Sequence, residues 1–365
     1  MVGRRKFLGM SAGLFSTRTL ATPWDWAFRA PRRVAPLHVD GSRLSSILED
    51  LQRYGTTGDG GTERMAFSQE DLDARNYLSD LMLDAEMTVT TDLCGNLVAR
   101  RLGTEPDALP IILGSHIDTV PQGGSYDGQV GSAGAVEVAL SLSEQDVSLR
   151  HPLEILIFVN EEGGKTGSRA LAGRVEPFEL DILTASGFTI AEGIDRVGGD
   201  SSRLADARRM PGGMVGFFEL HIEQGAILDR RAIDIGVVQG IVGIRRWNVR
   251  VVGFANHAGT TPMDQRRDAL VSMSVLVQAV HRIASETAGT QVATVGRIEA
   301  VPGAPNVVPG EVLATLEIRD LAMEKISSVF EEIEREAQRI AQRDAVSITF
   351  ESFYESLAAP TEPGL

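Results

Sequence analysis

One segment, an apolar run followed by polar residues, constrains the fold more than any other feature of the chain. The run at 111–113 is followed by GSHIDTVPQGGSYDG at 114–128, which holds His116, Asp118 and Asp127. A short apolar run bounded by glycine and turn residues is typical of a buried strand. In open α/β sheets, sites lie beyond the carboxyl ends of such strands. The segment therefore predicts a strand that delivers these side chains to one site.

These three side chains suit a metal ion. Zinc binds His nitrogen and carboxylate oxygen at about 2.0–2.2 Å, and a carboxylate commonly holds the other ring nitrogen of a ligating His. His116 is thus predicted to be a ligand, Asp118 its orienting partner and Asp127 a second ligand. A His and an Asp two residues apart also occur at strand ends as solvated side chains, so the interpretation depends on other segments.

Two further strand ends carry the same kinds of side chain. The apolar run at 153–159 leads into Glu161 and Glu162, and an alternating strand at 217–225 carries His221. Neighbouring side chains of an extended chain point apart. One glutamate can therefore bind metal while the other faces a substrate. The alternative is a solvated acidic turn, but three such strand ends in order favour a metal site.

Five ordered segments resemble one family, the two-zinc amidohydrolases that include N-carbamoyl-L-amino-acid hydrolases, allantoate amidohydrolases and β-ureidopropionases. They are GSHIDTVPQGGSYDG, NEEGG, ELHIEQG, HAGTTPM at 257–263 and NVVPG with LEIRD at 306–320. The resemblance extends over residues 40–350. Related aminoacylases and glutamate carboxypeptidases usually carry Asp-x-Lys-Gly where this chain has YDGQVG. That difference favours the carbamoyl-hydrolase branch.

The resemblance implies a centre of two divalent ions, zinc in the first place, with manganese, cobalt or nickel as alternatives. Asp127 would bridge the ions, His116 and Glu162 would bind separate ions, and His221 would complete one side. Glu161 would be the general base. It would take a proton from a water whose pKa the ions lower and pass it to the leaving nitrogen.

The resemblance also implies substrate-binding residues. His257 would stabilise the oxyanion, often from the partner subunit, and Gln224 would contact the ureido group. Asn306 and Arg319 would hold the substrate's carboxylate, for which the planar guanidinium fork is suited. Without the family, Arg319 would be interpreted as a strand-end ion pair and His257 as a loop histidine.

The order of predicted elements indicates an α/β fold in two parts. The first is a zinc-peptidase-like domain in which strands alternate with helices, which implies a largely parallel sheet. The second has the order βαββαβ, a split βαβ sandwich that fits the family's inserted lid and dimerisation domain. The expected parts are a leader, a catalytic metal-binding domain, a lid and dimerisation domain and the start of a return to the catalytic domain, at 1–37, 38–242, 243–352 and 353–365.

We therefore expect a metal-dependent amidohydrolase that cleaves linear C–N bonds of N-carbamoyl-L-amino acids or allantoate-like ureido acids. A metallopeptidase or N-acyl amino acid hydrolase of the same superfamily is one alternative. A non-catalytic remnant is another, because the family's final ligand His would follow Leu365 and His38, His151 and His281 match no ligand segment. On this ground we expect residues 1–365 alone to show little or no turnover.

Composition and a possible targeting segment limit the binding partners and the cellular location that we expect for the protein. The net charge of −15 argues against a nucleic-acid surface, so the expected partners are a small ureido or amide substrate with a carboxylate and a second copy bound through the lid. A single cysteine, Cys94, excludes an intrachain disulfide and is predicted to be a small buried hydrophobe. Arg4 and Arg5 precede an apolar stretch, which resembles a twin-arginine export signal. The protein is therefore expected to be periplasmic or exported, or else cytoplasmic, without a membrane span.

Overall fold

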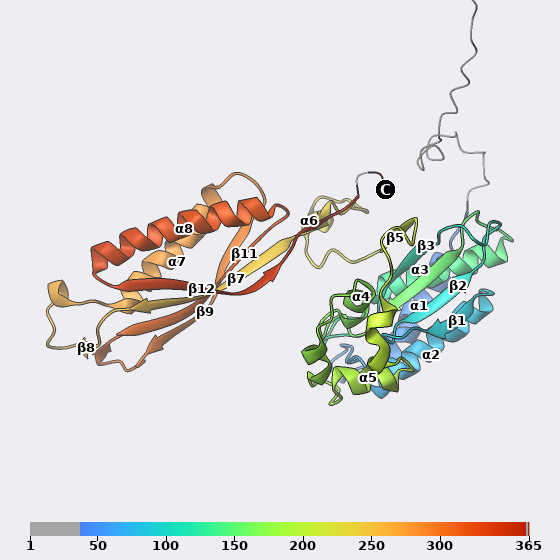
Figure 1. The fold of residues 1–365 in the computed structure, drawn as a ribbon, viewed down its shortest axis with the longest axis horizontal. Helices are drawn as coiled ribbons and strands as arrows, with labels where there is room; N and C mark the ends of the chain where they lie inside the picture. Colours follow the sequence, from blue (N-terminus) through green and yellow to red (C-terminus); the bar gives the residue numbers. More distant parts are fainter. Residues whose placement is uncertain (1–36, 363, 365) are drawn as a thin grey trace, which may run out of the picture. The chain divides into compact units, whose positions relative to one another are not determined.

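The structure is a computed structural model that describes residues 37–362 and residue 364. Its contacts divide the chain into two compact units, one ending at Gln224 and one beginning at Gly225 (Figure 1). The predicted twin-arginine residues lie outside the described residues. The contact division precedes the boundary predicted at 242/243, and the predicted domain limits stay a prediction.

A five-stranded mixed sheet forms the centre of the first unit, with the order β1-β2-β4-β3-β5. β3 pairs in parallel with β4 and β5, whereas β2 pairs antiparallel with β1 and β4. The sheet is less parallel than the sequence predicts, because the turn at 92–96 between β1 and β2 is too short for the crossover that a parallel pair needs. The strands are β1 Thr88–Thr91, β2 Leu97–Arg101, β3 Ile111–His116, β4 Leu153–Phe158 and β5 Gly216–Phe218.

Helices pack on this sheet through buried apolar side chains. Leu51, Leu78, Met82 and Ile155 belong to one core cluster and are all 0% exposed. Burial of such a side chain stabilises a fold by about 1.5–3 kcal/mol. Cys94 is also buried and forms no disulfide, as predicted. The α-helices are α1 Gly41–Arg53, α2 Gln69–Asp84, α3 Gln129–Glu144, α4 Thr166–Leu171 and α5 Ile190–Arg196, and 3₁₀ helices span Pro177–Asp181 and Ser201–Ala207.

The second unit is built on an antiparallel sheet with the order β12-β7-β11-β9. Its main elements follow in the order βαββαβ, which confirms the prediction. α7 and α8 lie beside each other along this sheet (Figure 1). Ile326 and Ile333 of α8 join its core, and the Trp247 ring stacks on Phe330 with centroids 4.1 Å apart. The elements are β7 Gly243–Val252, α7 Ala269–Glu286, β9 Val292–Val301, β11 Glu311–Asp320, α8 Met323–Asp344 and β12 Ser347–Ser356.

Short elements complete the second unit. β8 (Asn256–His257) pairs with β10 (Val307–Val308), and β6 (Gly240–Ile241) pairs with β13 (Ala359–Pro360). Two short helices remain, α6 at Ile227–Arg230 and a 3₁₀ turn at Met263–Gln265. In the part of the chain that the structure describes, no helix has the length and apolar character needed to cross a membrane.

Candidate metal centre and active site

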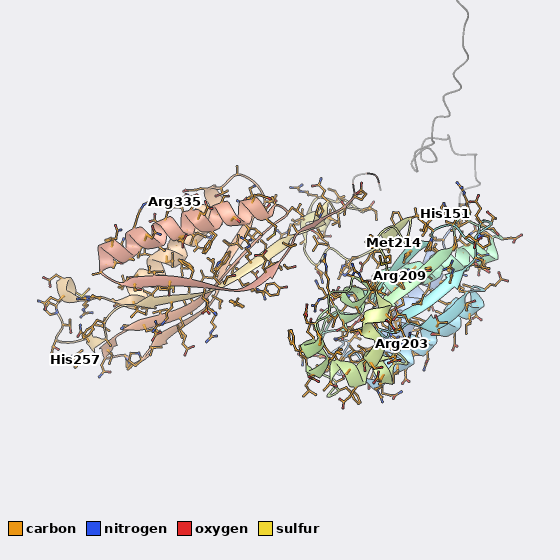
Figure 2. All side chains as sticks on the ribbon, viewed as in Figure 1. His151, Arg203, Arg209, Met214, His257 and Arg335 are labelled. Carbon is orange, nitrogen blue, oxygen red and sulfur yellow. The ribbon has the colours of Figure 1, made fainter. Side chains whose placement is uncertain are left out.

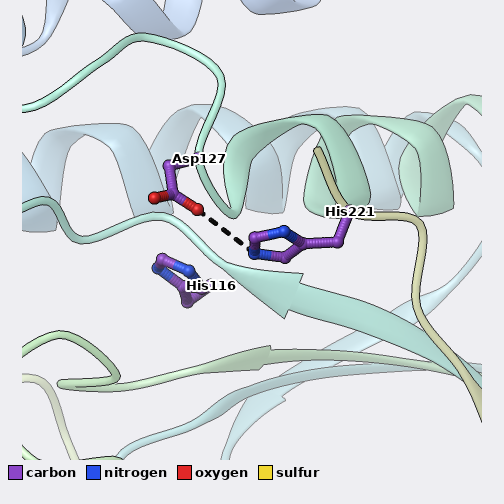
Figure 3. A group of neighbouring side chains, drawn as sticks. All are labelled: His116, Asp127 and His221. Atoms are coloured by element: carbon purple, nitrogen blue, oxygen red, sulfur yellow. Dashed lines mark ion pairs between the residues drawn. The ribbon is translucent and has the colours of Figure 1, made fainter. Parts of the chain in front are cut away.

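Three predicted ligands meet beyond the carboxyl ends of β3 and β5. His116 is the last residue of β3, Asp127 lies in the loop before α3, and His221 follows β5. One nitrogen or oxygen from each lies within 4.8 Å of the others (Figure 3). His221 Nε2 is 3.2 Å from Asp127 Oδ1. The side chains of these three predicted ligands therefore lie close together.

Both histidines present the same nitrogen to this group. His116 Nδ1 lies 3.0 Å from the carbonyl oxygen of Asp118, and His221 Nδ1 lies 2.8 Å from that of Ile222. A carbonyl only accepts, so these contacts favour the tautomer in which Nδ1 donates and Nε2 offers its lone pair. This is the arrangement that suits a neutral imidazole to a metal ion.

Gly128 fixes the position of the His116 ring. Its φ is +67°, in the left-handed region, and a Cβ at this position would lie 2.4 Å from His116 Nε2. A side chain would therefore occupy the space of the imidazole, and the backbone conformation also favours glycine. Sequence analysis did not single out Gly128, although its place directly after Asp127 and before α3 was a usable signal.

Asp118 acts on more than His116. Its buried carboxylate accepts hydrogen bonds from the backbone N–H groups of Glu161, at 3.2 Å, and Glu162, at 3.0 Å. Its Oδ1 lies 3.7 Å from His116 Nδ1, farther than its own carbonyl oxygen. Burial raises the pKa of Asp118 to about 7, against the lowering effects of His116 and these N–H groups. Asp118 therefore joins the β3 end to the turn that carries both glutamates.

Asp127 has one satisfied and one unsatisfied carboxylate oxygen. Gln224 Nε2 donates to Asp127 Oδ2 at 2.6 Å. The other oxygen, Oδ1, is buried and has no hydrogen-bond partner among the described residues. Buried polar atoms are almost always paired, so this oxygen fits a position facing a cation. Gln224, predicted to contact the ureido group, binds Asp127 in this structure, and its contact with a substrate stays a prediction.

The two glutamates approach the three ligands from the β4 side. Glu161 Oε2 lies 3.9 Å from His116 Nε2, and its side chain is 28% exposed. Burial raises the pKa of Glu162, and the nearby Glu161 and Asp127 carboxylates raise it further against the opposite effect of His116 and His221. Neither glutamate belongs to the three-residue group within 4.8 Å. A divalent cation would relieve the repulsion among these carboxylates, so the donor set fits a metal ion.

A cavity of about 190 Å³ adjoins Glu162. Its lining combines apolar Met65, Val120 and Leu183 with the acidic residues Asp118 and Glu162, and no Lys, Arg or His is among its described lining residues. Because like charges repel, this cavity suits an uncharged group and disfavours a carboxylate.

The predicted substrate residues of the second unit do not all come together. His257 faces Val307 across the β8–β10 pair, and Ala258 N donates to Asn306 O at 2.9 Å. Figure 2 shows the labelled His257 at the end of this unit where β8 lies. Arg319 lies near the other end of β11, opposite Ile244, and its Nε donates to Glu317 at 2.6 Å.

Strand geometry gives the scale of this separation. The eight strand steps from the start of β11 to Arg319 span about 26 Å at about 3.3 Å a residue. β10, which follows Asn306, pairs with β8 beyond the end of β7 that faces the start of β11. One copy of the chain therefore holds Asn306 and Arg319 apart.

Comparison with known proteins identifies the family. The model described as "Peptidase family M20/M25/M40" matches residues 112–307. An N-carbamoyl-L-amino acid amidohydrolase of Geobacillus stearothermophilus is 37% identical over 322 residues, which are 87% of this chain and 78% of that protein. The allantoate amidohydrolase of Escherichia coli (strain K12) is 31% identical, with 87% and 78% covered. A solved hydantoinase/carbamoylase family amidase from Burkholderia ambifaria superposes with a TM-score of 0.83 at 33% identity, covering 90% and 80% of the two chains. This chain belongs to the peptidase family M20/M25/M40, as the resemblance predicts.

Proposed function

We propose that this protein is a metal-dependent amidohydrolase that cleaves the linear C–N bond of N-carbamoyl-L-amino acids or allantoate-like ureido acids. The observation that carries the proposal is the group of His116, Asp127 and His221, in which the buried Asp127 Oδ1 lies 3.2 Å from His221 Nε2 and has no hydrogen-bond partner among the described residues. The names of the relatives support the substrate class, and they include a "Ureidoglycolate hydrolase" of Arabidopsis thaliana that is 32% identical. Two divalent ions, zinc before manganese, cobalt or nickel, are the proposed cofactors.

Different residues of the chain carry out proton transfer and position the metal ligands. When bound, divalent ions lower the pKa of water and polarise a scissile carbonyl. Glu161 is partly exposed and lies 3.9 Å from His116 Nε2, a position from which its carboxylate takes a proton from water and returns it to the leaving nitrogen. Asp118 holds the backbone of this glutamate. Gln224 holds Asp127 through Oδ2 and leaves Oδ1 for a cation.

Residues of the second unit would bind the substrate's carboxylate. Arg319 offers a planar fork of donors that can meet a carboxylate with two hydrogen bonds, and Asn306 offers an amide. The two residues lie near opposite ends of one sheet, so a single carboxylate meets both only if they come from different copies. His257, next to Asn306, would then also act from the partner copy. We therefore propose a homodimer whose sites share residues, with the second unit as lid and dimerisation domain.

A complementation experiment tests the shared site. Asn306→Ala and Arg319→Ala are purified separately, mixed, and allowed to exchange subunits. Each single variant is expected to have low activity, whereas a mixed dimer has one site with both residues intact, so mixing should restore activity. Failure of exchanged mixtures to regain any activity would exclude the shared arrangement.

The reaction class is tested by measuring ammonia released from the ureido substrates and the free amino acid released from the other two. The full-length protein, loaded with zinc, manganese, cobalt or nickel, is incubated with N-carbamoyl-L-amino acids, allantoate, an N-acetyl amino acid and a dipeptide. Turnover of the ureido substrates with little turnover of the other two is the expected result. Preferential dipeptide or N-acetyl hydrolysis would assign the chain to the peptidase or acylase type instead.

Location is a separate proposal. Arg4 and Arg5 before an apolar stretch support export by the twin-arginine route. Fusion of residues 1–37 to a folded reporter should direct the reporter to the periplasm, and Arg4→Lys with Arg5→Lys should abolish that transfer. A reporter that stays in the cytoplasm with the intact leader would contradict the proposal.

A further inference from the structure

Arg64 is a completely buried arginine between α1 and α2. Its side chain is among the largest that the fold buries fully, with 0% exposure. Its Nη1 donates to the carbonyl oxygens of Leu51 and Tyr54, both at 2.7 Å, at the end of α1. Its Nε donates to the carbonyl oxygen of Ile117 at 2.8 Å. Arginine is rarely buried unless it is paired. Nε and Nη1 link α1 to the residue directly after His116, whereas the buried Nη2 has no hydrogen-bond partner among the described residues.

The backbone of Arg64 makes a second connection to the same loop. Arg64 N donates to Thr119 Oγ1 at 2.9 Å, and Thr119 N donates to Arg64 O at 2.9 Å. Thr119 belongs to the loop at 117–126, which joins the predicted ligands His116 and Asp127. Three hydrogen bonds to Ile117 and Thr119 thus fix the first part of this ligand loop.

Thr62, two residues before Arg64, holds the last part of the ligand loop. Thr62 N donates to Gly123 O at 2.9 Å, and Thr62 Oγ1 lies 2.9 Å from Ser125 Oγ. The segment at 62–64 therefore runs along the ligand loop and binds it at both ends without contacting a predicted ligand through any described hydrogen bond.

Arg64 is also connected to the other half of the centre through Ile117, which precedes the buried Asp118. Burial lowers the pKa of Arg64 to about 10, against the raising effects of Asp71 and, to a smaller extent, Asp118. Asp118 in turn holds the backbone of Glu161 and Glu162. Hydrogen bonds therefore connect Arg64 to Ile117, directly before Asp118, and connect Asp118 to the turn after β4.

We propose that Arg64 is a positioning residue of the metal centre, which sets the spacing between the His116–Asp127 segment and the Glu161–Glu162 turn. The inference rests on the metal centre of the proposed function. Lysine cannot replace Arg64 in this role, because one ammonium nitrogen cannot stand both at Nε, facing Ile117, and at Nη1, facing Leu51 and Tyr54. Loss of the spacing weakens metal binding even while the fold persists.

The test compares zinc affinity with fold stability. Arg64→Lys and Thr119→Val are made in the full chain, with Arg43→Lys as the matched control. Arg43 also anchors α1, but it binds Glu137 of α3 and not the ligand loop. Zinc dissociation constants are measured by competition with a chromophoric chelator, well below the melting temperature of each metal-free protein, which is recorded in parallel. Below that temperature, lost stability alone leaves zinc affinity unchanged.

Arg64→Lys is expected to weaken zinc binding by about 10- to 100-fold, as loss of residues behind metal ligands typically does. Thr119→Val is expected to weaken it less, and Arg43→Lys to retain wild-type affinity. Should Arg64→Lys fail to fold, the comparison of Thr119→Val with Arg43→Lys decides. Wild-type affinity in Arg64→Lys or, where that variant does not fold, in Thr119→Val, or an equal loss in the control, would overturn the inference while leaving the metal centre intact. Absence of zinc binding by the wild type would overturn the metal centre itself and this inference with it.

Discussion

Substitution of Gly128 by alanine offers a direct test of the metal centre. The added Cβ would lie 2.4 Å from His116 Nε2, whereas ordinary contact begins at 3.4 Å, so the ring must move by about 1 Å. Metal–ligand distances tolerate only about 0.2 Å. Zinc affinity is therefore expected to fall by about 100-fold, as for the loss of a well-placed ligand contact.

Backbone strain must be separated from this steric effect. Alanine in the left-handed region costs about 1–2 kcal/mol whatever surrounds it. Gly212→Ala is the matched control, since Gly212 has a φ of +77° and nothing within 4 Å of its built Cβ. Both variants should lose similar stability from the backbone term, measured by urea unfolding of the metal-free proteins, but only Gly128→Ala should lose zinc affinity in chelator competition. Equal zinc affinities in the two variants would refute the role given to the His116 position.

Three further predictions follow from the site and the core. In the full-length protein, Glu161→Gln should keep its zinc content and lose about 10²-fold in turnover, because the change removes proton transfer but no ligand; zinc lost together with rate would make Glu161 a ligand. The kcat/KM of an N-carbamoyl amino acid should exceed that of its amide by about 10- to 100-fold, since Arg319 would lose charge-assisted hydrogen bonds of about 1.5–3 kcal/mol with the amide. Arg319→Lys should lack this difference. Equal values for acid and amide in the wild type would reject the carboxylate role. Burial raises the pKa of the Cys94 thiol, so at pH 8 it should react with a thiol reagent only on unfolding; fast labelling of native protein would contradict its place in the core.

Of the four ligands that strand-end reasoning predicted, His116, Asp127 and His221 lie in one group, whereas Glu162 does not belong to it. His116 and His221 follow parallel neighbours β3 and β5, so their approach follows from sheet topology, and Asp127 follows from the short loop back to α3. The order βαββαβ was also readable, because alternating burial in β11 and the apolar face of α8 are local patterns.

Hydrogen-bond partners could not be predicted in the same way. Spacing indicated that Asp118 lies beside His116, but not that its carboxylate turns to the N–H groups of Glu161 and Glu162, which come from a distant segment. Gln224 falls in the strand predicted at 217–225, but β5 ends at Phe218 and the chain after it is irregular. Strand alternation therefore does not fix the direction of its side chain, which binds Asp127. The burial of Arg64 could not be predicted, because a charged residue in a polar loop carries no sequence signal for burial.

The separation of Asn306 and Arg319 follows a different rule. The two are close in the sequence, yet an extended strand converts each residue into about 3.3 Å of distance. The family resemblance assigns a role to each residue but does not say how far apart the residues lie. The register of β11 against β7 shows that Arg319 lies opposite Ile244, at the end of β11 away from Asn306.

Both imidazoles of the centre take their tautomer from the peptide backbone. His116 Nδ1 meets the carbonyl oxygen of residue 118 and His221 Nδ1 that of residue 222, so no side chain supplies either bond. A substitution at 222 would therefore leave the hydrogen bond of His221 in place, because every amino acid brings the same carbonyl. A substitution at 118 would likewise keep the carbonyl that faces His116, but it would remove the carboxylate that holds the backbone of Glu161 and Glu162.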